Sequence, residues 1–82
     1  MTYLVKFDKN PEKFLFSLED KEFDRIINKL DEVKENPFRY LDHFEGKYYK
    51  LRIGDYRLLM DIDFEKKLLL VRVFDKRGRV YK

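Results

Sequence analysis

Cationic side chains recur at alternate positions in the second half of this sequence, inside stretches that are otherwise apolar or aromatic. Lys50 and Arg52 are two residues apart in one such stretch, and Arg57 and Arg72 occupy similar places in the next two. Guanidinium groups match phosphate oxygens and aromatic rings stack on nucleobases, so cations interleaved with rings suit a nucleic-acid strand. The alternative is a polar sheet face exposed to water, which antiparallel sheets allow.

The positive charge of the 82-residue chain is concentrated toward its C-terminus. The formal net charge is +3, yet residues 1–41 carry a balance of −1 and residues 42–82 a balance of +4. Residues 71–82 hold five basic side chains and one acidic side chain. A positive field gathered at one end attracts a polyanion more strongly than the mean charge indicates.

The composition excludes several classes of protein. Cysteine is absent and histidine occurs once, so disulfides and thiolate nucleophiles are ruled out and a Ser–His triad is disfavoured. The longest uncharged apolar run, Leu68–Val71, is far shorter than the roughly 20 residues of a membrane span. The N-terminus lacks the pattern of a signal peptide, and the three glycines form no phosphate-binding loop. We therefore expect a small cytoplasmic protein with no membrane association and no small-molecule cofactor.

Two acidic groupings are weaker candidates for chemistry. His43 lies beside Asp42 and Glu45, but one imidazole with scattered carboxylates falls short of a metal-ligand set. Asp61 and Asp63 share one side of a predicted strand, where ion pairs with neighbouring arginines are the expected role. We predict no metal site.

Two helices are predicted in the first half of the chain. A short strand over Tyr3–Phe7 precedes the first helix, which we expect to begin at Asn10 as N-cap with Pro11 as its first residue. Apolar residues at helical spacing over residues 23–33 predict the second helix, which must end before Pro37.

Three strands are predicted in the second half, over Tyr48–Ile53, Tyr56–Phe64 and Leu68–Phe74, after a stretch without periodicity at residues 38–47. The order β-α-α-β-β-β predicts an α+β fold over a single domain of residues 1–82. The two helices should pack on one face of an antiparallel sheet.

Alternation along the strands assigns the side chains to two faces. On the last strand, Leu69, Val71 and Val73 suit the core, which leaves Leu70, Arg72 and Phe74 outward. The face away from the helices is therefore expected to present four cations beside apolar groups, namely Lys50, Arg52, Arg57 and Arg72.

The segment Tyr48–Leu58 reads YYKLRIGDYRL and the end of the chain, Val73–Tyr81, reads VFDKRGRVY. Together with the loop Asn36–Tyr40 and Gly46, these segments resemble the RelE/ParE superfamily of toxins, most closely the archaeal RelE-type toxins. The resemblance spans nearly the whole chain, and the family fold agrees with the predicted order of elements. It implies a toxin of a type II toxin–antitoxin system that cuts messenger RNA in the ribosomal A site and so inhibits translation.

The resemblance also implies roles for four residues of a metal-independent endoribonuclease (an mRNA interferase). Lys50 and Arg57 match cations that stabilise the phosphate at the cleaved bond. Tyr81 matches the tyrosine near the end of the family sequence, and we assign it the general base. Arg77 matches the arginine of the terminal phrase, where it would protonate or stabilise the leaving group.

Further cations are expected to contact RNA or the ribosome, and they are Lys47, Arg52, Arg72, Lys76 and Arg79. Two positions depart from the family pattern: Tyr48 replaces a strand lysine, and Lys76 replaces a histidine common in the terminal phrase. The implied partner besides the ribosome with its messenger RNA is an antitoxin of RelB type. Two alternatives remain open, a ParE-like inhibitor of DNA gyrase and a catalytically degenerate member that only binds RNA or protein.

Overall fold

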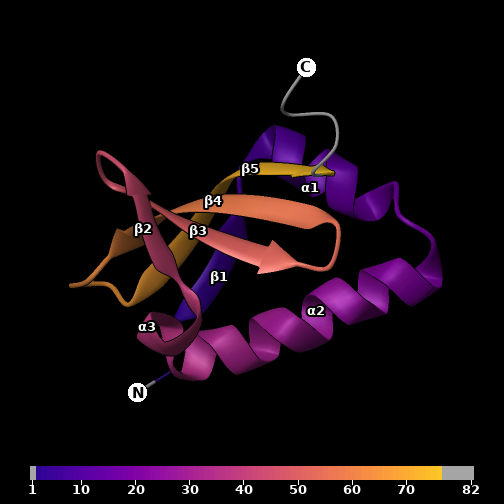
Figure 1. The fold of residues 1–82 in the computed structure, drawn as a ribbon. Coiled ribbons are helices and arrows are strands. Elements are labelled where there is room, and N and C mark those ends of the chain that lie inside the picture. The colour runs from indigo at the N-terminus through magenta and orange to yellow at the C-terminus, as the bar shows by residue number, and fades with distance from the viewer. Residues whose placement is uncertain (1, 77–82) are drawn as a thin grey trace.

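Five strands and three helices make up the part of the chain that the computed structural model describes, residues 2–76 (Figure 1). In chain order they are β1 (Leu4–Phe7), α1 (Lys9–Phe16), α2 (Asp20–Glu35), α3 (Pro37–Tyr40), β2 (Asp42–Glu45), β3 (Tyr48–Ile53), β4 (Tyr56–Asp63) and β5 (Leu68–Lys76). The predicted α+β architecture is confirmed. None of the helices within residues 2–76 is long and apolar enough to cross a membrane.

The strands form one sheet in the order β1-β5-β4-β3-β2. Strands β2 to β5 are antiparallel to their neighbours, as predicted, but β1 runs parallel to β5, with Leu4 opposite Leu68. The sheet is therefore mixed, and the expectation of a wholly antiparallel sheet was wrong for β1. A parallel pair needs a long connection between its two strands, and the sixty residues between β1 and β5 contain both long helices and the remaining strands.

Helix α1 begins earlier than the sequence suggested. Asp8, rather than Asn10, is the N-cap residue, and the backbone N–H of Glu12 donates to the Asp8 carbonyl at 2.9 Å. Pro11 is the third residue of the helix, where it lacks no hydrogen bond because the first-turn N–H groups have no partner within the helix. Helix α2 ends at Glu35, directly before Asn36 and Pro37, as predicted.

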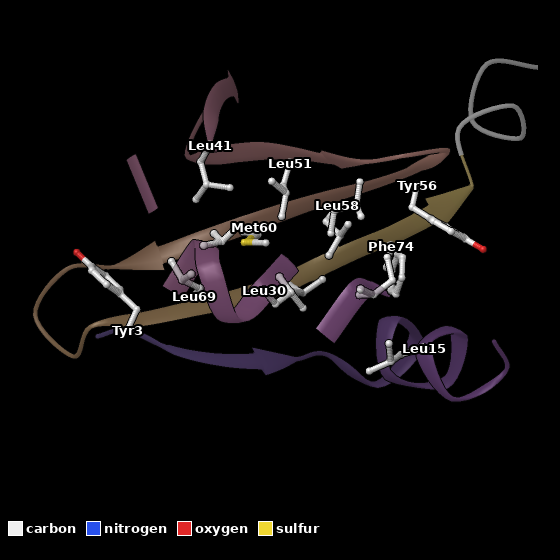
Figure 2. Packing of buried hydrophobic residues seen from close by; sticks show 14 residues of the cluster. Tyr3, Leu15, Leu30, Leu41, Leu51, Tyr56, Leu58, Met60, Leu69 and Phe74 are labelled. Carbon is white, nitrogen blue, oxygen red and sulfur yellow. The ribbon is translucent and has the colours of Figure 1, made fainter. Parts of the chain in front are cut away.

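The core lies between α2 and the face of the sheet that α2 covers (Figure 2). Ile26, Leu30 and Val33 follow one stripe of α2 and are 0–3% exposed. They meet the central strands, whose apolar residues Leu58 and Met60 on β4 are fully buried. Burying a large apolar side chain contributes about 1.5–3 kcal/mol to the free energy of folding, so this helix–sheet contact is the main source of stability.

A β-bulge in β5 changes which of its residues face the core. Leu59 pairs with Val73 and Met60 with Val71, so Arg72 is the extra residue on β5. Beyond that point the alternation is shifted by one, because two residues of the bulged strand oppose one on its partner. Phe74 therefore pairs with Leu58 and is 5% exposed, whereas the sequence had placed Phe74 outward and Val73 in the core. Both assignments were wrong for this reason.

The stretch without periodicity, residues 38–47, contains two elements that the sequence did not reveal. Helix α3 is a single turn, and strand β2 pairs with β3 although all four of its residues are exposed. An exposed edge strand carries no alternation of buried and exposed side chains, so the sequence contains no pattern that predicts β2.

The turn between β3 and β4 requires glycine at position 54. The φ angle of Gly54 is +57°, and a Cβ added there would overlap the guanidinium group of Arg25 on α2. Gly46, in the turn between β2 and β3, has the same φ of +57° but no atom within 4 Å of an added Cβ. The two glycines differ, therefore, only in this close approach.

We expect Gly46→Ala to lower the free energy of unfolding by about 1–2 kcal/mol, the cost of a left-handed conformation for a residue with a Cβ. Gly54→Ala should lower it by a similar amount, because the added Cβ meets only the far end of the flexible, half-exposed Arg25 side chain, which can move aside. Urea unfolding followed by circular dichroism measures both losses. A much larger loss for Gly54→Ala would mean that Arg25 is held fixed at this turn.

Candidate nucleic-acid interface

The face of the sheet opposite the helices, here called the open face, carries the predicted cations of β3 and β4. Lys50 and Arg52 alternate with the buried Leu51 and Ile53, so their side chains point away from the core. The register places Arg52 directly opposite Arg57, and residues directly opposite each other on neighbouring strands share a face. The structure thus brings Lys50, Arg52 and Arg57 together.

Two arginines directly opposite each other are unfavourable in an isolated sheet, because like charges at this spacing repel. On its other side Arg57 has an acid as its cross-strand partner, since Asp75 of β5 lies opposite it in the register. An anion bound beside Arg52 and Arg57 would relieve the repulsion between them. The arrangement is typical of a surface that binds phosphate.

Arg57 is the one charged residue that is buried among those the structure describes, with 7% of its surface exposed. The ring of Phe44 on β2 lies against it, 5.7 Å from the guanidinium carbon to the ring centroid. A cation held in such a place is fixed in position and acts through a medium less polar than water. Its field on a nearby phosphate is stronger than that of an exposed arginine.

Phe44 also lies beside the second cation of this group, since the Lys50 ammonium nitrogen is 5.6 Å from the ring centroid. The ring is 40% exposed. Sequence reasoning did not select Phe44, because its strand was not recognised.

At the β5 end of the open face, cations are paired with acids. Arg72 donates from its Nη1 to Asp8 at 3.0 Å and from its Nε to Asp61 at 3.1 Å. Asp8 first, and then Asp61, raise the pKa of Arg72 by accepting these hydrogen bonds. The Lys47 ammonium is 3.8 Å from the same Asp61 carboxylate. The positive charge predicted for Arg72 and Lys47 is therefore partly neutralised.

The two acids of β4 have different roles. The expected ion pair with an arginine is confirmed for Asp61, which is paired with Arg72. Asp63 instead accepts a hydrogen bond from the backbone N–H of Lys66 at 3.0 Å, and so it stabilises the turn that leads into β5.

A hollow of about 510 Å³ lies over this paired region of the open face. Its lining combines the charged groups with apolar side chains, and it includes Lys47, Asp61, Phe64, Leu68, Leu70 and Arg72. In this region a bound anion would have to compete with Asp8 and Asp61 for the cations.

The remaining predicted residues lie elsewhere. Lys76 pairs with Tyr56, which is buried on the helix side, so Lys76 is separated from the cations of the open face. It lines a different pocket, beside Glu22 and Arg25 of α2. Arg77, Arg79 and Tyr81 lie outside the described residues.

His43 has a structural role. Its Nε2 is 2.7 Å from the carbonyl oxygen of Gly46, across the turn that joins β2 to β3. Within residues 2–76, no three histidine, aspartate or glutamate side chains lie close enough together to hold a metal ion.

Comparison with known families gives one match, which covers most of the chain. The family described as "ParE toxin of type II toxin-antitoxin system, parDE" matches residues 6–80. No curated protein matches the chain.

Several solved structures have the same fold. The archaeal RelE–RelB complex from Pyrococcus horikoshii OT3 contains a chain that is 29% identical, with a TM-score of 0.80 over 96% of this chain and 99% of that one. The isolated E. coli RelE toxin is 26% identical, with a TM-score of 0.75 over 90% and 83% of the two chains. The RelBE2 complex from Mycobacterium tuberculosis, at 22% identity, shares the fold with a TM-score of 0.83 over 94% and 100%.

The pairing of Asp61 with two cations predicts that this carboxylate weakens RNA binding. Asp61→Asn keeps the shape of the side chain but removes the charge that faces Arg72 and Lys47. We expect tighter binding of a single-stranded RNA oligonucleotide, and a plot of log affinity against log salt that is steeper by about 0.7, for one more phosphate contacted. Fluorescence anisotropy at several salt concentrations measures both effects.

Asp24→Asn is the matched control for this experiment, because Asp24 is exposed on α2 and its removal changes the net charge equally. If both variants steepened the salt dependence to the same extent, only the overall charge would matter and the open face would have no special part in binding.

Proposed function

We propose that this chain, which belongs to the ParE toxin family of type II toxin–antitoxin systems, stops translation by cutting messenger RNA on the ribosome. The observation that carries this proposal is the group of three cations on the open face, Lys50, Arg52 and Arg57, with Arg57 held rigidly by burial. The likeness to RelE toxins from Pyrococcus horikoshii and E. coli supports it.

The proposed reaction uses the 2′-hydroxyl of the RNA as nucleophile. The 2′-oxygen loses its proton to a general base and forms a bond to phosphorus, while the bond from phosphorus to the 5′-oxygen breaks. The leaving 5′-oxygen takes up a proton, and the products are a 2′,3′-cyclic phosphate and a free 5′-hydroxyl. The step needs a base, an acid and positive charge near phosphorus.

We assign these roles as the family resemblance implies. Lys50 and Arg57 stabilise the charge that develops on the phosphorane oxygens, where a fixed cation is worth more than a mobile one. Tyr81 is the general base, a role that positive charge around it would support by favouring the phenolate form of a tyrosine. Arg77 protonates or stabilises the leaving oxygen.

The other predicted cations serve binding. Arg52, adjacent to Arg57 in the register, contacts the RNA backbone next to the cleaved phosphate. Lys47, Arg72, Lys76 and Arg79 contact RNA or the ribosome, and those paired with acids contribute once an anion competes for them. These contacts make binding depend strongly on salt.

The proposed inhibitor is an antitoxin of RelB type. RelE toxins in several of the similar structures are found in complexes with RelB proteins, including those from Pyrococcus horikoshii and E. coli. Such a partner would neutralise the toxin by covering the cations of the open face.

A second candidate function is inhibition of DNA gyrase without catalysis. It is favoured by the description of the matching family, which is named for ParE toxins. That function does not need the combination of Lys50, Arg57, Arg77 and Tyr81, all of which this sequence retains.

Translation with purified ribosomes separates the two functions and tests the role of Tyr81. We expect the native protein to cut messenger RNA at the A site, and Tyr81→Phe to be slower by about 100-fold or more, because it lacks the ionisable oxygen of the base. Primer extension on the messenger RNA measures the cut. Full activity of Tyr81→Phe would remove this residue from the mechanism. Intact messenger RNA, together with lost supercoiling by gyrase, would favour the second function.

The role of Lys50 is tested with a charge-removing substitution on each side of the molecule. Lys50→Met keeps most of the side chain but loses the cation, and we expect cleavage to slow by about 100-fold. Lys21→Met makes the same change on α2, in the groove beside Asp24, and should leave the rate unchanged. A similar loss in both variants would mean that net charge, not the position of Lys50, determines activity.

A further inference from the structure

We propose that Phe44 is a platform on which one base of the RNA stacks, next to the phosphate held by Lys50 and Arg57. This inference rests on the proposed function, since it names the residue that positions the substrate for the reaction. It assigns to Phe44 a stacking contact with a base of the RNA, whereas the charged residues contact only the phosphate.

The first support is the local backbone of β2. The register changes from His43 opposite Tyr49 to Glu45 opposite Tyr48, so Phe44 is the extra residue of a β-bulge. Bulges occur next to active sites because they redirect a side chain. Here the bulge lies in an edge strand of four exposed residues, and Phe44 itself is 40% exposed.

The second support is the position of the ring relative to the cations. The Lys50 ammonium and the Arg57 guanidinium carbon lie 5.6 Å and 5.7 Å from the ring centroid, within the range of cation–π contacts. One nucleotide carries a flat base and a phosphate joined by a single sugar. The ring therefore has two cations over it, and a base stacked on its exposed surface would bring the phosphate of the same nucleotide close to them.

The third support is exposure. Phe44 keeps 40% of its surface accessible although Arg57 beside it keeps only 7%. The ring thus covers the arginine and still presents surface to a ligand. Stacking on an aromatic side chain tolerates every base because each base has a π-face, so Phe44 would strengthen binding without reading a particular codon.

The test combines two changes that each remove one partner of the stack. Phe44→Leu removes the ring and keeps an apolar side chain, and a synthetic messenger RNA with an abasic nucleotide next to the cleaved bond removes the base. Native protein should cut the abasic messenger about tenfold more slowly than the intact one. Phe44→Leu should cut the intact messenger about tenfold more slowly than native protein does. It should cut the abasic messenger no more slowly than the intact one, because ring and base form one contact and removing either partner already loses it.

Phe16→Leu is the matched control, because Phe16 is 67% exposed on α1, on the helix side, and stacks on Phe23. It should cut both messengers at native rates. Phe44→Tyr keeps the ring and should retain most of the activity. Melting followed by circular dichroism checks that every variant is folded.

Two results would refute the stacking platform and leave the proposed function standing, provided that native protein cuts messenger RNA. In the first, Phe44→Leu cuts at the native rate. In the second, Phe44→Leu slows cleavage of the intact and the abasic messenger by the same factor. If native protein cuts no messenger RNA, the proposed function fails and a second measurement decides. The chain contains no tryptophan, so Phe44→Trp supplies a single tryptophan at the site, whose emission can be excited apart from that of the six tyrosines. Quenching by a single-stranded RNA oligonucleotide and not by an abasic oligonucleotide supports stacking, and equal responses to both refute it.

Discussion

Because α1 and α2 cover only one face of the sheet, each strand must place apolar side chains on that face and is free to place charges on the other. Leu51 and Ile53 on β3 and Leu58 and Met60 on β4 are buried under the helices. The residues between them in sequence, Arg52 and Arg57 among others, are forced to the opposite side. The cationic surface is thus a geometric result of the same alternation that builds the core, and it needs no loop or cofactor to assemble it.

The β-bulges in β2 and β5 are exceptions to this alternation. They explain which side-chain positions could be predicted from the sequence and which could not. Helices α1 and α2, the strands β3 to β5 and the cations of β3 and β4 follow from periodicity, which depends only on residue type. The burial of Phe74 and the position of Phe44 do not, because one extra residue in a strand shifts every later side chain and leaves no mark in the composition. The parallel pairing of β1 also depends on where a distant strand lies, which local patterns do not contain.

Electrostatics divides the open face into two regions of different character. Around Phe44 the cations lie close to one another, and Arg57 is withdrawn from water. Around Asp61 they are held by carboxylates from two separate parts of the chain, one near β1 and one on β4. An anion bound beside Lys50, Arg52 and Arg57 would lower the repulsion among these three cations. The second region keeps the sheet together where β1, β5 and β4 meet, and it limits non-specific attraction of polyanions.

The position of β5 between β1 and β4 has a consequence for the synthesis of the protein. The strand that joins the two parts of the sheet is the last one made, so a nascent chain cannot close its sheet until residues 68–76 have emerged from the exit tunnel. Before that moment β1 has no neighbour, and a hairpin of β3 and β4 alone is marginally stable in water. Closure of the sheet therefore waits for the synthesis of β5.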